Sequence, residues 1–232
     1  MKRTVVALLL AGVTVAAGWF PGSAQGNANS FPEIEGLRTA VGRTFGPSGF
    51  RLVGTLALLF TVTDFENENS AAAGMPQLGD QLIVDLAEQG NDTSGPKSAS
   101  VRPLGDERIA YAGTLIALEE DDSTFDEFMV AALVVREGVF VHFMYGAAIA
   151  GDPLADLAAV AEKIIGRQPG GDVTSVGDDG VREGGLWDLL PRIEDLPEGF
   201  VLEKEEELAP VDERQDQTAS PRARPTSPAG SQ

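Results

Sequence analysis

The stretch from Glu107 to Tyr145 constrains the fold of this chain more than any other part of the sequence. It holds three runs of apolar and β-branched residues, 107–118, 125–136 and 139–145, separated by two turn signals. In the second signal, Glu137-Gly138, glycine supplies the positive φ that a tight hairpin turn requires. Three runs joined by short turns predict an antiparallel meander. The run 139–145 is apolar on both faces, so it should lie centrally in the sheet beneath a helix.

Two segments with apolar residues at helical spacing predict the helices that cover this sheet. Ser70 is a candidate N-cap for the first, but Pro76 shifts the expected helix to 75–89. Asp152-Pro153 is a typical opening for the second, 153–165, because Asp caps a helix and Pro suits its first turn. The fold class is therefore predicted to be α+β, an antiparallel β-sheet of four or five strands with helices packed on it.

The segments before the first helix are less regular. Phe50–Phe65 is rich in apolar and β-branched residues and predicts one long strand or two short ones. Residues 31–49 mix Pro, Gly and scattered apolar residues. That mixture fits a short helix or an edge strand.

The composition changes after Arg167, which predicts the end of a globular α+β domain spanning 31–167. Residues 168–185 are Gly- and Asp-rich and predict a linker. Residues 186–208 regain apolar anchors, including Trp187 and Phe200. We expect this short segment to fold back onto the domain rather than to dock on a partner. Residues 209–232 lack large apolar side chains and predict a disordered tail.

A short internal echo links the two ends of the predicted domain. The pattern P-x-G-F-x-L occurs at 47–52 and again at 197–202. Each copy predicts a turn that leads into a strand. The echo is either a coincidence over six positions or the start of a second, truncated unit.

The order of these elements resembles a known family. The turn Leu104–Glu107 precedes a strand, and the hairpin Val134–Val141 precedes a closing helix, as in exported bacterial proteins with a PsbP/Mog1-like α/β sandwich. The segments 189–191 and 195–200 also resemble a motif of uncharacterised exported proteins of the Chloroflexi and Actinobacteria. The resemblance implies this sandwich fold and a binding or assembly role. It implies no catalytic residues.

The first 24 residues predict an export signal. Lys2 and Arg3 precede an apolar stretch, 5–20, and Gly22-Ser23-Ala24 offers the small residues that signal peptidase needs. We expect cleavage before Gln25 and a protein that is secreted. The alternative is an uncleaved N-terminal anchor. The chain contains no cysteine, which excludes a lipid-anchored lipoprotein and a disulfide framework, so a hydrophobic core must hold the fold.

The charge of the chain limits the classes of partner that it can bind. The formal net charge is −19, and removal of the two cations of the signal makes it −21. Such a chain repels nucleic-acid backbones and anionic membrane surfaces. We therefore expect a protein or small-molecule ligand outside the cell, no nucleic acid, and no membrane association after cleavage.

Candidate sites are few. His142 is the one histidine, and its neighbours Phe140 and Met144 predict packing rather than catalysis. An acidic run is a weak candidate for Ca²⁺ but lacks the EF-hand spacing and its glycine, so a solvated hairpin tip is the expected reading; its members are Glu119, Glu120, Asp121, Asp122 and Asp126. No catalytic residue and no cofactor are predicted.

These features favour an exported, non-enzymatic binding or assembly domain. Two alternatives stay open: a secreted hydrolase acting through Asp and Glu carboxylates, and a structural subunit of an envelope complex. A convergent carboxylate pair would favour the first, and a large exposed apolar patch the second.

Overall fold

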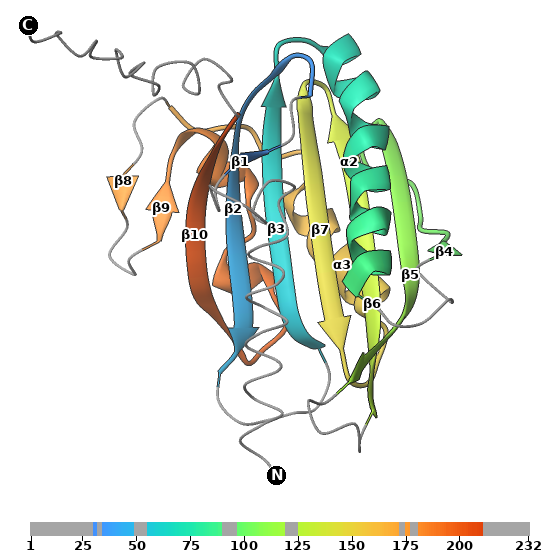
Figure 1. Ribbon diagram of the computed structural model, residues 1–232. Coiled ribbons are helices and arrows are strands. Elements are labelled where there is room, and N and C mark those ends of the chain that lie inside the picture. Colours follow the sequence, from blue (N-terminus) through green and yellow to red (C-terminus); the bar gives the residue numbers. More distant parts are fainter. Residues whose placement is uncertain are drawn as a thin grey trace, which may run out of the picture.

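The computed structural model describes residues 30–31, 34–48, 55–89, 97–118, 125–171, 175–176 and 181–210. These form one eight-stranded sheet in the order β1-β10-β2-β3-β7-β6-β5-β4, with a separate two-stranded piece, β8-β9. Every pairing in the large sheet is antiparallel except β1 with β10. Figure 1 shows helix α2 on one side of this sheet and helix α3 on the other. The α+β class is therefore confirmed, with more strands than the four or five expected.

The meander forms as predicted. It comprises β5 (Glu107–Leu118), β6 (Phe125–Glu137) and β7 (Phe140–Ala148), and β7 lies between β6 and β3. Gly138 has a φ of 58° in the turn between β6 and β7, the left-handed conformation that glycine adopts without strain. Asp106 holds this turn from the neighbouring loop, because its carboxylate accepts the N–H of Gly138 at 2.8 Å.

Two long strands precede the first helix. The ambiguous region 31–49 contains β2 (Leu37–Pro47), an interior strand of the sheet between β10 and β3. β3 (Thr55–Phe65) is the predicted strand of 50–65 without its first residues, which lie outside the described part. β2 is interior because a C-terminal strand covers what would otherwise be its free edge.

Helix α2 (Glu68–Gln89) begins earlier than the residue-75 start predicted. Asn67 is the cap, since its Oδ1 accepts the N–H of Ser70 at 2.9 Å. Pro76 cannot donate a helical hydrogen bond, yet the helix runs through it. The reason is burial on both sides of the proline: Ala71, Met75 and Leu78 pack on the sheet while Pro76 is exposed.

Helix α3 (Pro153–Ile164) follows its prediction to within one residue. Asp152 caps it, accepting the N–H groups of Leu154 and Ala155 at 3.1 and 3.2 Å. None of the helices in the described ranges is both long and apolar enough to cross a membrane.

The segment after residue 180 belongs to the same fold. It forms 3-10 turns η1 (Gly185–Leu189) and η2 (Ile193–Asp195), and then β10 (Phe200–Pro210), which pairs with β2. The division at residue 167 into domain, linker and separate segment is therefore not a division of the fold, and β10 extends into the first residues of the predicted tail. Residues 211–232 lie outside the described part.

The remaining strands are short: β1 (Ser30–Phe31), β4 (Lys97–Ser98), β8 (Ser175–Val176) and β9 (Arg182–Glu183). The second copy of the sequence echo does lead into a strand, β10, whereas Pro47 ends β2. The two copies meet where Phe200 pairs with Pro47 and Ser48 donates to the carbonyl of Gly199. Pro47 and Phe200 belong to one sheet, so the second copy does not open a second unit, and residues 49–52 of the first copy lie outside the described part.

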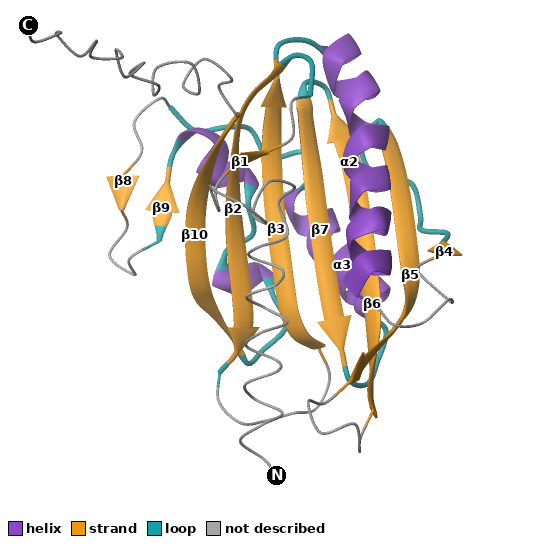
Figure 2. Cartoon of the chain, viewed as in Figure 1, coloured by secondary structure: helices purple, strands orange, loops and turns teal. Residues whose placement is uncertain are grey.

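The sheet has a core on each side. The α2 face carries alternate residues of the strands, among them Leu59, Val134 and Phe143, under Met75 and Leu78 of the helix. The α3 face carries the intervening residues, among them Phe60, Leu133 and Met144, under α3, η1 and η2. Figure 2 shows the helical elements divided between the two sides of the strands. This double cover explains why β7 is apolar on both faces.

Candidate functional site

The α2 face changes character along the sheet. Strand register places six residues of this face in one row across the strands: Glu206, Gly42, Thr61, Phe143, Val134 and Ile109. The row is polar over β10, β2 and β3 and apolar over β7, β6 and β5. Helix α2 lies over the apolar end, where its Gly79 faces Ile109 and Tyr111.

The polar end of the row contains a buried carboxylate. Glu206 is 6% exposed, although it lies on β10, the long strand nearest one end of the sheet. Lys204, two residues earlier on the same strand and face, donates from Nζ to Oε2 of Glu206 at 2.6 Å. The lysine itself is exposed over 43% of its side chain. One oxygen of the carboxylate is thus paired with a half-exposed cation.

The other oxygen of Glu206 has no hydrogen-bond partner. Oε1 is buried, and so is Oγ1 of Thr61, which also lacks a partner. Both groups flank Gly42. A Cβ placed on this glycine would lie 3.3 Å from Thr61 Oγ1 and 3.8 Å from Glu206 Cγ. We call Glu206, Lys204, Thr61 and Gly42 the Glu206 cluster. Buried polar atoms almost always have a hydrogen-bond partner in folded proteins, so two buried atoms without a partner beside one glycine need an explanation.

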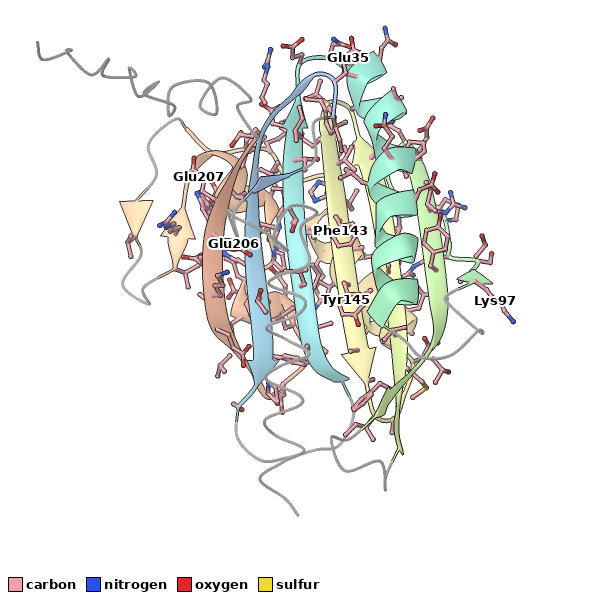
Figure 3. The ribbon with its side chains drawn as sticks, viewed as in Figure 1. Glu35, Lys97, Phe143, Tyr145, Glu206 and Glu207 are labelled. Carbon is pink, nitrogen blue, oxygen red and sulfur yellow. The ribbon has the colours of Figure 1, made fainter. Side chains whose placement is uncertain are left out.

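The unpaired atoms of the Glu206 cluster could be satisfied by a hydrogen-bond donor. An ionised carboxylate only accepts hydrogen bonds, whereas a threonine hydroxyl both donates and accepts. A group with an N–H or O–H seated above Gly42 would satisfy Glu206 Oε1, and Thr61 would complete the contact. Figure 3 shows Glu206 on β10 and the aromatic residues Phe143 and Tyr145 on β7, beside α2. Burial raises the pKa of Tyr145, which keeps its phenol protonated.

The opposite face of β2 and β10 carries a structural cluster that the sequence did not reveal. Arg43 is 1% exposed and donates from Nε to Oε1 of Glu205 at 2.8 Å and from Nη1 to the carbonyl of Pro191 at 3.1 Å. Its guanidinium carbon lies 5.8 Å from the ring centroid of Trp187, and that of Arg182 lies 5.1 Å from the same ring. Burial lowers the pKa of Arg43, and the hydrogen bond that it donates to Glu205 opposes that shift. These contacts attach the segment 181–191 to the sheet.

A part-buried ion pair attaches the following turn to the residues just after α3. Arg167 donates from Nη2 to both carboxylate oxygens of Asp195, at 2.7 and 2.9 Å. Asp195 also accepts the backbone N–H of Arg192 at 2.7 Å, and Lys163 donates to its carbonyl oxygen at 2.7 Å. Trp187 is 4% exposed, and Phe200 packs partly buried against the core of the α3 face. Residues 186–208 therefore fold back on the domain.

His142 lies on the α3 face of β7, and it is 2% exposed. Its Nε2 has no hydrogen-bond partner. Burial lowers the pKa of its imidazole to about 4, so the ring is neutral at physiological pH. Its register neighbours are Val62 and Val135, both fully buried. The position supports packing, and the absence of a catalytic role stays a prediction.

The weak calcium candidate falls largely outside the described residues. Glu119, Glu120, Asp121 and Asp122 precede Phe125, where β6 begins, and Asp126 is described only as part of that strand. Within the described part of the chain, no three His, Cys, Asp or Glu side chains converge in a way that could hold a metal ion. The calcium site therefore stays a prediction.

Sequence reasoning missed the Glu206 cluster. The run Glu203–Glu207 consists of four glutamates and one lysine, a composition typical of a solvated strand. The signal that was present is the period of two: Lys204 and Glu206 share a face. That this face meets Gly42 and Thr61 depends on pairing between strands that are about 160 residues apart in the sequence, and no local pattern reports it.

Comparison with known proteins gives little similarity. No family model matches the chain, and none of the curated proteins matches it. Among solved structures, the extracellular domain of PknH from Mycobacterium tuberculosis aligns with a TM-score of 0.29 and 11% sequence identity. The alignment covers 44% of this chain and 51% of that one, so the chain spans about half the length of the structure it matches.

Proposed function

We propose that this chain is an exported, non-enzymatic binding domain that holds its ligand or partner at the Glu206 cluster. One observation carries the proposal: Glu206 Oε1 and Thr61 Oγ1 are buried without partners on either side of Gly42. Oε2 of Glu206 is paired with Lys204, but Oε1 is a buried acceptor without a donor, and such an atom costs about 1–3 kcal/mol. A ligand that donates there recovers this free energy on binding.

The surroundings favour binding over hydrolysis. Carboxylate-dependent glycosidases use two acidic residues that flank the scissile bond. In the Glu206 cluster the group facing the carboxylate is an ammonium, Lys204 Nζ. An ion pair of this kind can hold a bound ligand in place, but it provides no second carboxylate to act as acid or nucleophile.

The exposed apolar side chains favour a ligand-binding role over a purely structural one. In the described part of the chain, the large apolar residues that are exposed are Ile149, in the turn after β7, Val176 on β8, Ile193 on η2 and Val201 on β10. Scattered single residues of this kind are normal on a protein surface. They do not make the broad apolar patch that a structural subunit would bury.

Export and the finer fold type belong to the same proposal. The basic start, apolar stretch and small residues of 1–24 support secretion with cleavage before Gln25. The succession of two strands, a helix, three strands and a helix supports a PsbP/Mog1-like sandwich. That resemblance implies binding or assembly, in agreement with the cluster.

The test is a fragment screen on the secreted protein, read by amide chemical shifts. Ammonium, guanidinium, amide and polyol fragments supply different donors. We expect at least one to shift the amides of Gly42, Thr61 and Glu206 together. Gly42→Ala places a methyl group 3.3 Å from Thr61 Oγ1 and should abolish those shifts. The control is Gly171→Ala, because a Cβ there meets nothing within 4 Å. If no fragment binds, or if both variants bind equally, a trapped water explains the orphan atoms and the proposal fails.

A further inference from the structure

The outer edge of β10 is open over most of its length. β10 pairs with β2 on its inner side from Phe200 to Leu208. On its outer side, β1 pairs with Ala209 and Pro210. Within the described part of the chain, no strand pairs with the outer side of residues 200–208. An open edge presents backbone N–H and C=O groups to which another extended segment can add.

The residues of this edge disfavour pairing with a second copy of the chain. It carries Glu203, Glu205, Glu206 and Glu207 with one lysine, and the register shifts between Leu202 and Lys204. Charges and bulges on edge strands prevent pairing between identical copies. Two copies of β10 would bring like charges together, whereas a basic segment would be attracted. The same residues that repel a second copy therefore select a partner of opposite charge.

The Glu206 cluster gives such a partner a specific anchor. Because Glu206 lies on β10 itself, a strand added outside β10 would place one of its residues beside Glu206 in the same row. A lysine or arginine at that position would donate to Oε1, the oxygen that has no donor, once the side chain of Glu206, now 4% exposed, turns toward the added strand. Val201, which is 42% exposed at the start of β10, offers an apolar contact to the same strand.

We infer that the edge of β10 binds an extended, basic peptide segment of a partner protein by strand addition, with one cationic side chain donating to Glu206. This rests on the proposed function and names the partner for the same cluster. The backbone of the edge provides the ladder of hydrogen bonds, and the carboxylates Glu203 and Glu207 attract the segment. Attraction between exposed charges weakens with salt, because the Debye length is about 8 Å at physiological ionic strength.

The test uses three nine-residue peptides on the secreted full-length protein. One alternates Lys and Val, one alternates Glu and Val, and one is the Lys/Val peptide with every backbone nitrogen methylated. The methylated peptide has the same charge but has no backbone N–H to donate to a ladder. We expect the unmethylated Lys/Val peptide alone to bind, with slowed hydrogen exchange at amides within 200–208. Equal binding of the methylated peptide would show simple charge attraction and overturn the inference.

Variants locate the contact. Glu206→Gln keeps the shape and removes the charge, and it should weaken the Lys/Val peptide about 10- to 100-fold, the range for loss of a charge-assisted hydrogen bond. Glu207→Lys should weaken binding of the Lys/Val peptide and increase the affinity of the protein for the Glu/Val peptide. The control is Glu35→Lys, which changes the charge equally in a turn far from Glu206 and Glu207 (Figure 3). Equal losses in all three variants would refute a specific edge.

Other occupants give distinct results. If the protein dimerises and this protects 200–208, a second copy fills the edge and the inference fails. If the Lys/Val peptide binds only after residues 25–29 are deleted, the chain's own segment upstream of β1 is the occupant, and the inference fails again. If fragments bind at Gly42 and no peptide protects β10, the inference falls while the proposed function stands.

Discussion

Trp187 provides the sharpest test of how the C-terminal segment belongs to the fold. The side chain is 4% exposed and packs with the core of the α3 face. Two guanidinium groups lie over its ring, those of Arg43 and Arg182, at 5.8 and 5.1 Å. Trp187→Ala removes the apolar area and both cation–π contacts together.

The expected loss is large. Truncation of a buried Trp to Ala costs about 3–5 kcal/mol, and a cation–π contact adds about 0.5–2 kcal/mol when desolvated. Arg43 keeps its side-chain hydrogen bonds to Glu205 and Pro191 in the variant, so we expect a decrease near the lower end of this sum, about 4 kcal/mol in the free energy of unfolding. That is a large part of the 5–15 kcal/mol typical of a whole domain. Trp187→Phe retains an aromatic ring and should lose about half as much.

The assay is urea unfolding of the secreted protein, followed by far-ultraviolet circular dichroism. Ile193→Ala is the control, because Ile193 belongs to the same segment and is 41% exposed. It should change the stability by less than about 0.5 kcal/mol. If Trp187→Ala lost less than about 1 kcal/mol, residues 181–210 would not be an integral part of the domain, and the assignment of β10 to the main sheet would be refuted.

Three further predictions follow from the described contacts and the sequence. The pKa of His142 is lowered from 6.5 to about 4 by burial, so its neutral ring favours the folded state above pH 6.5; about 3 kcal/mol is lost as the pH falls through 4. His142→Gln should cost about 1 kcal/mol at pH 7, leave binding intact and flatten this pH dependence, and an unchanged slope or lost binding would contradict the assignment. Asp195→Ala should lower the free energy of unfolding in urea by about 3–5 kcal/mol, because it leaves Arg167 without its carboxylate partner in a part-buried site. The control Glu183→Ala breaks an ion pair whose side chains are 41% and 42% exposed, and it should lower that free energy by less than about 1 kcal/mol. Similar losses in the two variants would show that burial does not set the difference. N-terminal sequencing of the secreted protein should begin at Gln25, and a first residue of Met1 would show that the segment 1–24 is retained.

Short-range signals in the sequence were enough to predict several local elements. The turn at Gly138 follows from the need for a positive φ, and helix α3 follows from the cap at Asp152 and the apolar spacing after it. The central place of β7 follows from its apolar residues on both faces. Each of these depends on residues within about one turn or one strand of each other, so a pattern in the sequence can report them.

The contacts between segments that are distant in the sequence could not be predicted, because they depend on tertiary packing. Pro76 predicted a late start for the first helix, but burial of Ala71 and Met75 outweighs one lost hydrogen bond. The acidic run of β10 resembled a solvated surface, yet its pairing with β2 buries Glu206 beside Gly42 and Thr61. Strand pairing depends on backbone hydrogen bonds, which are the same for every residue but proline. The choice of partner strand is therefore made by the packing of the whole sheet, and the candidate site exists only once that choice is made.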